Sequence, residues 1–156
     1  MLVKIKSVAH IGLESVLVEV EVDVATQGFP GFNIVGLAGK AVEEARERVK
    51  TAITNSGFDF PGKKITVNLA PADLPKDGGA YDLPMAVGIL AASEQGPEKS
   101  TQDSIFYGEL SLDGGLRATK GVLLVGLFSK KKRIDQIFVP VESANEAAVV
   151  EGISVF

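Results

Sequence analysis

The sequence contains no cysteine among its 156 residues and only one histidine, His10. The lack of cysteine excludes a disulfide, a thiolate-ligated zinc site and a thiol nucleophile, and it suits a cytoplasmic protein. His10 lies on an alternating N-terminal segment with no partner near it in sequence. One imidazole cannot support a histidine-rich metal site, so we expect His10 to be structural.

An excess of positive charge is also missing. The formal net charge is -4 and the pI is about 5.1, so no global basic field attracts nucleic acid. The N-terminal residues alternate and include His10 and Glu14, so they form neither a signal peptide nor a membrane span. Neither a repeat nor a long linker is present. We expect a single domain over residues 1–156, with no membrane partner.

A nucleotide-binding P-loop is a third absence. The Walker A pattern needs a glycine, four residues and then Gly-Lys-Ser/Thr, so that backbone amides surround the phosphates. Gly31 and Gly36 have the glycine spacing, but Leu37 follows them. Gly39-Lys40 is followed by Ala41 and lacks the earlier glycine. We therefore expect no cofactor in this chain.

Alternation of period two is the clearest pattern that the sequence does have. Valines at alternate positions over 16–24 predict a strand with one buried face and one acidic, solvated face. Further strands are expected over 2–10, 32–35, 65–69, 104–109, 136–139 and 153–156, and helices over 40–55, 82–92, 120–132 and 143–150. Strands come first and then alternate with helices, which predicts an α/β (α+β) fold with helices packed on a mixed sheet.

Residues 69–92 combine a strand end, a glycine loop and an apolar helix. Gly78 and Gly79 permit positive φ angles and close backbone approach. Asp82 is expected to cap the helix, which should be buried because it has no polar face. Asp73, Asp77 and Asp82 could offer oxygens to Mg²⁺, and the loop amides could bind phosphate. Since Asp82 already has a capping role and residues 78–80 lack serine and threonine, we favour a loop without metal.

Charged residues on two helices allow simple interpretations. Glu44 with Arg48 has helix-pair spacing, which supports an exposed outer face for the helix over 40–55. The most basic run of the chain is Lys130, Lys131, Lys132 and Arg133, at the end of a predicted helix. This run is either favourable cation placement at a helix C-terminus or a candidate DNA contact through phosphates. Both interpretations stay open.

Residues 75–80, Pro-Lys-Asp-Gly-Gly-Ala, resemble the Pro-Lys-Asp-Gly-Pro-Ser stretch of Lon-type proteases, and the resemblance continues through 108–114 and 139–140. Lon proteolysis uses a Ser-Lys dyad, in which the lysine is the base for the serine hydroxyl. On this sequence the serine position falls on Ala80 and the lysine position on Val125. The resemblance thus implies a missing dyad beside a loop that would be a functional remnant, with members Lys76, Asp77, Gly78 and Gly79.

Five blocks in order resemble the N-terminal domain of the ComM/YifB family of magnesium-chelatase-like AAA+ ATPases: 32–37, 44–49, 55–58, 67–74 and 108–114. The sequence departs from the family at 38–40, where Ala-Gly-Lys replaces the usual Pro-Asp or Pro-Glu. The resemblance implies a Lon-protease-like fold, shared with GHMP kinases, that contains a left-handed βαβ crossover. It also implies an AAA+ module beyond Phe156 that binds ATP and Mg²⁺, a homo-oligomeric hexameric ring, and ATP-driven DNA branch migration in natural transformation.

Two function hypotheses follow from these resemblances. The first is a non-catalytic accessory domain of such an ATPase, acting in DNA processing. The alternative is a residual Lon-like peptidase that uses Ser111 or Thr119 as nucleophile, with Lys120 nearby. Neighbours in sequence on a turn rarely face one another productively, so we favour the first hypothesis.

Overall fold

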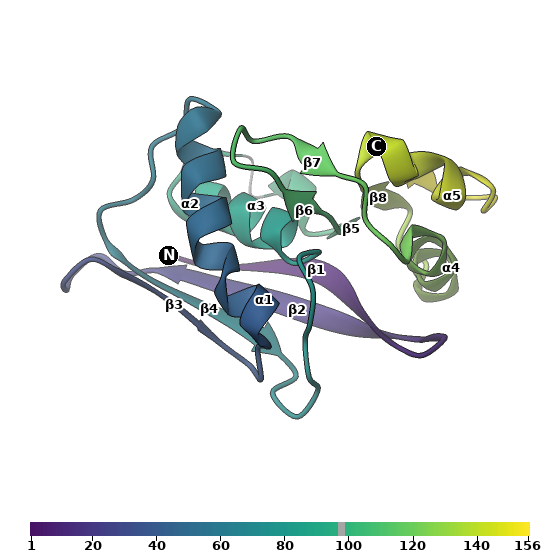
Figure 1. Ribbon diagram of the computed structural model, residues 1–156, viewed down its shortest axis with the longest axis horizontal. Coiled ribbons are helices and arrows are strands. Elements are labelled where there is room, and N and C mark those ends of the chain that lie inside the picture. Colours follow the sequence, from purple (N-terminus) through teal and green to yellow (C-terminus); the bar gives the residue numbers. More distant parts are fainter. Residues whose placement is uncertain (97–98) are drawn as a thin grey trace.

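The structure is a computed structural model that describes residues 1–96 and 99–156. Seven strands form one sheet in the order β3-β4-β2-β1-β5-β8-β9 (Figure 1). Parallel and antiparallel pairs both occur in it, which confirms the predicted mixed sheet. The strands are β1 Leu2–Ile11, β2 Glu14–Val24, β3 Gly31–Val35, β4 Lys64–Ala70, β5 Ser104–Phe106, β8 Gln136–Phe138 and β9 Ser154–Val155. A separate hairpin pairs β6 (Glu109–Leu110) with β7 (Leu116–Arg117).

Helices cover the sheet as the α/β class predicts. In Figure 1, α2 and α3 lie over β1 to β4, while α4 and α5 gather beside β8. The helix α3 packs against β1 and β2, and α2 packs on α3. The helices are α1 Lys40–Glu43, α2 Ala45–Asn55, α3 Asp82–Ala92, α4 Val122–Lys132 and α5 Ala144–Ala148, with 3-10 turns at Lys99–Thr101 and Val141–Ser143. Among the described residues, no helix is long and apolar enough to cross a membrane.

The alternating strand β2 has the two faces that its sequence predicts. Its even-numbered valines from Val18 to Val24 are buried in the core. On the other face, Glu19 accepts a 2.9 Å hydrogen bond from Lys4 Nζ of β1, and Glu21 lies 3.6 Å from the same nitrogen. Such exposed pairs contribute little to stability, so the buried valines fix the orientation of the strand.

Several predicted boundaries were wrong, each for a local reason. The helix over 40–55 is interrupted at Glu44, where Arg48 Nη2 donates to the carbonyl of Ala41. The strand over 104–109 divides, because the Gly108 amide leaves the sheet and donates to Ala80 O. The helix expected over 143–150 begins at Ala144 without a side-chain cap, because the Ser143 hydroxyl accepts a hydrogen bond from the Thr119 amide.

Candidate functional site

Lys76 ties the glycine loop to two neighbouring backbone segments. Its side chain is 1% exposed, and Nζ donates to Gly36 O at 2.8 Å and to Pro71 O. The Lys76 carbonyl accepts the Gly39 amide at 2.8 Å, next to an isolated parallel bridge. Burial lowers the pKa of Lys76 below its ordinary value, against the opposing charge of Asp73. The lysine therefore acts as a cross-link between loops.

The segment that receives Lys76 can be built only around a glycine. Gly36 has φ +107°, and a Cβ on it would lie 2.3 Å from Leu69 O at the end of β4. Any side chain at this position would clash with the backbone. The close approach brings the end of β3 against β4 and presents the Gly36 carbonyl to Lys76. The loop conformation and the buried ammonium thus depend on each other.

The buried Asp82 forms an ion pair with the partly exposed Arg48 behind the loop. Arg48 Nε lies 2.7 Å from Asp82 Oδ2, and Nη2 lies 3.1 Å from Oδ1, so the contact is bidentate. The Asp82 side chain is fully buried, and its Oδ2 also accepts the Leu110 amide at 3.1 Å. Bidentate geometry with a third donor is the arrangement in which a buried pair is best satisfied. This network joins α2, α3 and β6.

Two predictions about these charges are corrected by this network. Asp82 is the first residue of α3 and makes no side-chain cap, because its carboxylate is already taken by Arg48 and Leu110. Arg48 pairs with Asp82 and not with Glu44, although Glu44 lies at the expected helix spacing. Burial raises the pKa of Asp82 above its ordinary value, while Arg48 opposes that rise.

The positions that correspond to the Lon dyad lie in one apolar cluster. Ala80 is 8% exposed at the end of the glycine loop, and Val125 is fully buried on α4. Both belong to a cluster that also includes Ile105, Val122 and Phe128. A methyl and an isopropyl group can neither attack a carbonyl nor accept a proton. As placed here, this pair has no acyl-transfer chemistry.

The remaining loop residues are Asp77, Gly78 and Gly79. Asp77 and Gly78 are exposed, and Gly79 lies close to Glu109. Gly78 has φ +83°, as predicted, and its amide donates to Asp77 Oδ1 at 3.1 Å. Gly79 has no positive φ; a Cβ there would meet Glu109 Oε2 at 2.7 Å. The exposed Asp73 and Asp77 are separated in role from the buried Asp82, which is bound to Arg48. Within residues 1–96 and 99–156, no three acidic or histidine side chains form a metal-binding group.

The hydroxyls of the peptidase alternative are occupied by turn contacts. Ser111 Oγ donates to Asp113 Oδ1 and to Gly115 O inside the β6–β7 turn. Thr119 Oγ1 donates to Arg117 O at 2.9 Å. Neither hydroxyl has a lysine or a histidine as its hydrogen-bond partner in these contacts. The geometry therefore gives no activated nucleophile here.

Comparison with known proteins identifies the family. Residues 20–143 match the family model described as subunit ChlI of Mg-chelatase. The competence protein ComM of Haemophilus influenzae is 46% identical over 142 residues, which cover 91% of this chain and 28% of that protein. The uncharacterized protein YifB of Escherichia coli is 43% identical over 144 residues, covering 92% of this chain and 28% of that protein. The chain belongs to the magnesium-chelatase-like ComM/YifB family.

The segments that carry this family resemblance also build the site. Lys76 reaches Gly36 in the first block, Arg48 lies in the second, and Pro71 and Leu110 lie in the fourth and fifth. The family resemblance and the polar network thus meet in one region. The chain spans 28% of the length of these two relatives.

The basic run of this ComM/YifB-family chain does not form one patch. Lys131 lines a hollow with Leu13 and Leu127. Lys132 and Arg133 line a different hollow of about 670 Å³, whose other charged residues are Lys6, Lys99, Asp103 and Asp135. Lys6 Nζ lies 3.8 Å from Asp103 Oδ1. Consecutive residues diverge by about 100° around a helix, which explains why the run is divided between the two hollows.

His10 has the kind of packed environment that was expected. Its Nδ1 lies 3.0 Å from Ser15 Oγ across the β1–β2 hairpin, and its ring meets Tyr107 edge-on with centroids 5.7 Å apart. Burial lowers the pKa of His10 from its ordinary 6.5. The ring thus packs on the β1–β2 hairpin against Tyr107, while its buried Nε2 has no hydrogen-bond partner among the described residues.

Proposed function

We propose that this chain is a non-catalytic accessory domain of a magnesium-chelatase-like AAA+ ATPase that processes DNA. The observation that carries the proposal is the apolar cluster around Ala80 and Val125, where a Lon-type enzyme needs a nucleophile and a base. The charged groups of the same loop support it as well. Lys76 holds two carbonyls and Asp82 holds Arg48, so both serve the fold.

The wider proposal concerns the polypeptide in which this domain works. We place ATP and Mg²⁺ in an AAA+ module that follows this domain, and we expect a homo-oligomeric, hexameric ring in the cytoplasm. Its activity would be ATP-driven branch migration of DNA in natural transformation; the ComM relative is named a competence protein. The Lon-like fold with a left-handed crossover belongs to the same proposal, and the parallel neighbours β3 and β4, joined through α1 and α2, supply a βαβ unit.

The experiment compares the full-length protein with a version that lacks residues 1–156. We expect the full-length protein to move a four-way DNA junction only when ATP is hydrolysed, and a non-hydrolysable ATP analogue is the control. The deletion should keep ATP hydrolysis but lose junction movement, because an accessory domain supports the ring without supplying its chemistry. Full-length protein that hydrolyses ATP but never moves a junction would contradict the proposal.

The basic run offers a second, narrower test of DNA contact. Replacing Lys132→Glu and Arg133→Glu should reduce the slope of log affinity against log salt by about 0.9 for each duplex phosphate that the protein no longer neutralises. Lys130→Glu with Lys131→Glu makes the same charge change on the preceding residues and should leave the slope unchanged. An unchanged slope in both variants removes the run as a DNA contact.

A further inference from the structure

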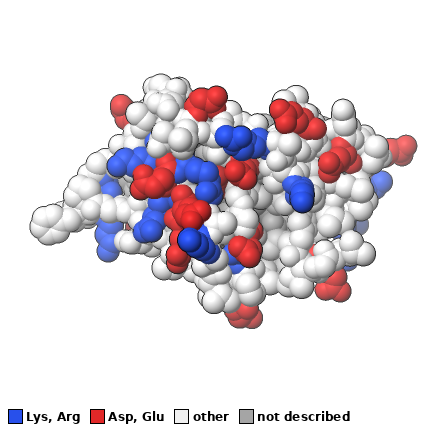
Figure 2. All heavy atoms as spheres, in the orientation of Figure 1, with Lys and Arg blue, Asp and Glu red and all other residues white. Residues whose placement is uncertain are grey.

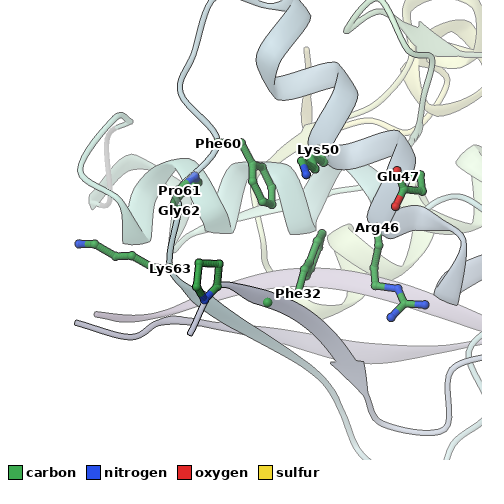
Figure 3. A pocket seen from close by; sticks show the side chains of 10 residues that line it. Phe32, Arg46, Glu47, Lys50, Phe60, Pro61, Gly62 and Lys63 are labelled. Carbon is green, nitrogen blue, oxygen red and sulfur yellow. The ribbon is translucent and has the colours of Figure 1, made fainter. Parts of the chain in front are cut away.

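A pocket of about 590 Å³ between β3 and α2 combines aromatic rings with cations (Figure 3). Phe32 comes from β3, and Phe60 comes from the segment that precedes β4. Arg46 and Lys50 project from α2, and Lys63 lies on the opposite rim. Ligand sites in proteins commonly have volumes of about 300–1,000 Å³, so the pocket has room for a nucleotide unit.

The two rings form a fixed platform. Their centroids are 5.8 Å apart and their planes are inclined by 42°, and both rings are half-buried against the main core cluster. Lys50 Nζ lies 5.7 Å from the centre of the Phe60 ring, within cation-π range. These rings are held from behind by the core, and one of them has a cation over it, so together they offer an aromatic and cationic surface to a flat aromatic ligand.

The cations of this pocket face solvent and are not held in ion pairs by the described residues. Arg46, Lys50 and Lys63 are all exposed, and in residues 1–96 and 99–156 none of them lies within 4.0 Å of a carboxylate. Arg46 Nε contacts only a backbone oxygen, Glu43 O, at 3.2 Å. Figure 2 shows basic side chains gathered over this part of the molecule, interleaved with acidic ones. Three cations and one acid, Glu47, give the lining a net charge of +2 (3 - 1).

A third aromatic ring extends the surface beyond the pocket. Phe29 is 93% exposed, and it directly precedes Pro30, which lines the pocket. An apolar ring held almost entirely in water gains nothing from the fold of this chain. Its position in the chain, directly before the pocket residue Pro30, offers a second stacking position next to the pocket.

We infer that this pocket binds single-stranded nucleic acid, with bases stacked on the rings and phosphates at the cations. Unpaired bases expose the flat faces that such rings need, whereas the bases of a duplex are already stacked on one another. A groove with alternating cations and aromatics recognises a strand without reading its sequence. The inference rests on the proposed function, which makes DNA the strand, and it deepens that function by locating a contact outside the basic run.

The first test maps the contact directly on the full-length protein. Oligodeoxythymidylate containing 5-iodouracil, longer than the roughly 4–16 nucleotides that such surfaces cover, is photo-crosslinked and the protein is digested for mass spectrometry. We expect crosslinked peptides that contain Phe29, Phe32 or Phe60. Crosslinks elsewhere in the protein with none in these peptides would overturn the inference.

The second test is a matched pair of charge reversals in the full-length protein, measured by fluorescence anisotropy. Arg46→Glu with Lys50→Glu should lower affinity for the oligonucleotide about tenfold or more and reduce the salt slope by about 1.4, that is, about 0.7 for each of two phosphate contacts. Arg117→Glu with Lys120→Glu makes the same charge change at exposed residues outside the pocket and should have no such effect. Equal reductions in both variants, or none in either, would contradict the inference.

Competition separates the related ligands. Duplex DNA of the same sequence should displace the oligonucleotide from this pocket poorly, and dTMP alone should displace it only weakly because it offers one base and one phosphate. Equal displacement by duplex would overturn the inference, as would binding of dTMP without any binding of the oligonucleotide. Junction movement without crosslinks at the rings would reject the pocket alone, whereas crosslinks without junction movement would reject only the proposed function.

Discussion

Basic side chains are used in opposite ways at the glycine loop and at the β3–α2 pocket. At the loop, Lys76 is buried on two carbonyls and Arg48 is bound to Asp82. At the pocket, Arg46 and Lys50 come from the same helix as Arg48, yet both are exposed beside aromatic rings. A cation already held by the fold has little to offer a ligand, while one that faces solvent can exchange water for phosphate. The two regions therefore differ in whether their cations are bound by the fold, as at the glycine loop, or face solvent, as at the pocket.

Loss of the ion pair between Arg48 and Asp82 should change the free energy of unfolding most. Arg48→Met leaves the Asp82 carboxylate buried without its partner and should lower the free energy of unfolding by about 3–5 kcal/mol. Chemical denaturation measures the change. Arg46→Met, on the exposed side of the same helix, is the matched control and should stay within about 0.5 kcal/mol. Similar changes in the two variants would erase the distinction between the two regions.

Removal of the loop cross-link should have the next largest effect. Lys76→Ala leaves Gly36 O and Pro71 O without their donor inside the fold, which should lower the free energy of unfolding by about 2 kcal/mol. Lys120→Ala, at an exposed lysine, should change it by less than about 0.5 kcal/mol. If Lys76→Ala were neutral in denaturation but abolished DNA binding, the lysine would be a ligand-binding group and not a cross-link.

Restoring a hydroxyl to the loop tests whether chemistry is missing there. Ala80→Ser puts a polar group into an apolar cluster and should lower the free energy of unfolding by about 1 kcal/mol. It should create no peptidase activity, because Val125 provides no base. Ala80→Gly is the control for a change of side chain without a hydroxyl. Cleavage of casein by the Ala80→Ser variant would show that a base is present after all.

The smallest effect should come from protonation of His10, which lowers the free energy of unfolding as the pH falls. Burial lowers its folded-state pKa below the ordinary 6.5, so the unfolded state binds the proton more readily. The stability contribution is therefore full above pH 6.5 and is lost as the pH falls through the folded pKa. His10→Gln should flatten this part of the curve of unfolding free energy against pH. Denaturation between pH 7.5 and pH 5 measures it, because this range extends roughly one pH unit or more to each side of the ordinary pKa of 6.5. A curve that keeps its slope would exclude His10 as the cause.

Much of the fold could be predicted because local patterns decide it. The alternating valines predicted a strand with one buried face, and the lack of a polar face predicted a buried helix; β2 and α3 show both features. The site was harder, because its contacts join distant parts of the chain. Arg48 and Asp82 are 34 residues apart, and the nearby Glu44 satisfied the helix-pair rule equally well. Lysine is among the residues least often buried, so nothing local indicated that Lys76 would be enclosed.

The pocket was missed for a related reason. Phe32 and Phe60 belong to separate segments of the chain, and only the fold brings them to 5.8 Å of each other beside α2. A basic run is visible in the sequence as adjacent letters, whereas Arg46, Lys50 and Lys63 are dispersed. Helix spacing places Arg46 beside Lys50, but only the fold brings Lys63 and the two rings to them.

A proteolysis assay shows whether the glycine loop is a scaffold or an active site. Full-length protein is incubated with fluorescent casein, ATP and Mg²⁺, with an active Lon-type protease as the positive control. We predict no release of labelled peptides above background, because Ala80 and Val125 supply neither nucleophile nor base. Release of labelled peptides that is abolished by Ser111→Ala or Thr119→Ala would show that the domain is a peptidase and not a scaffold.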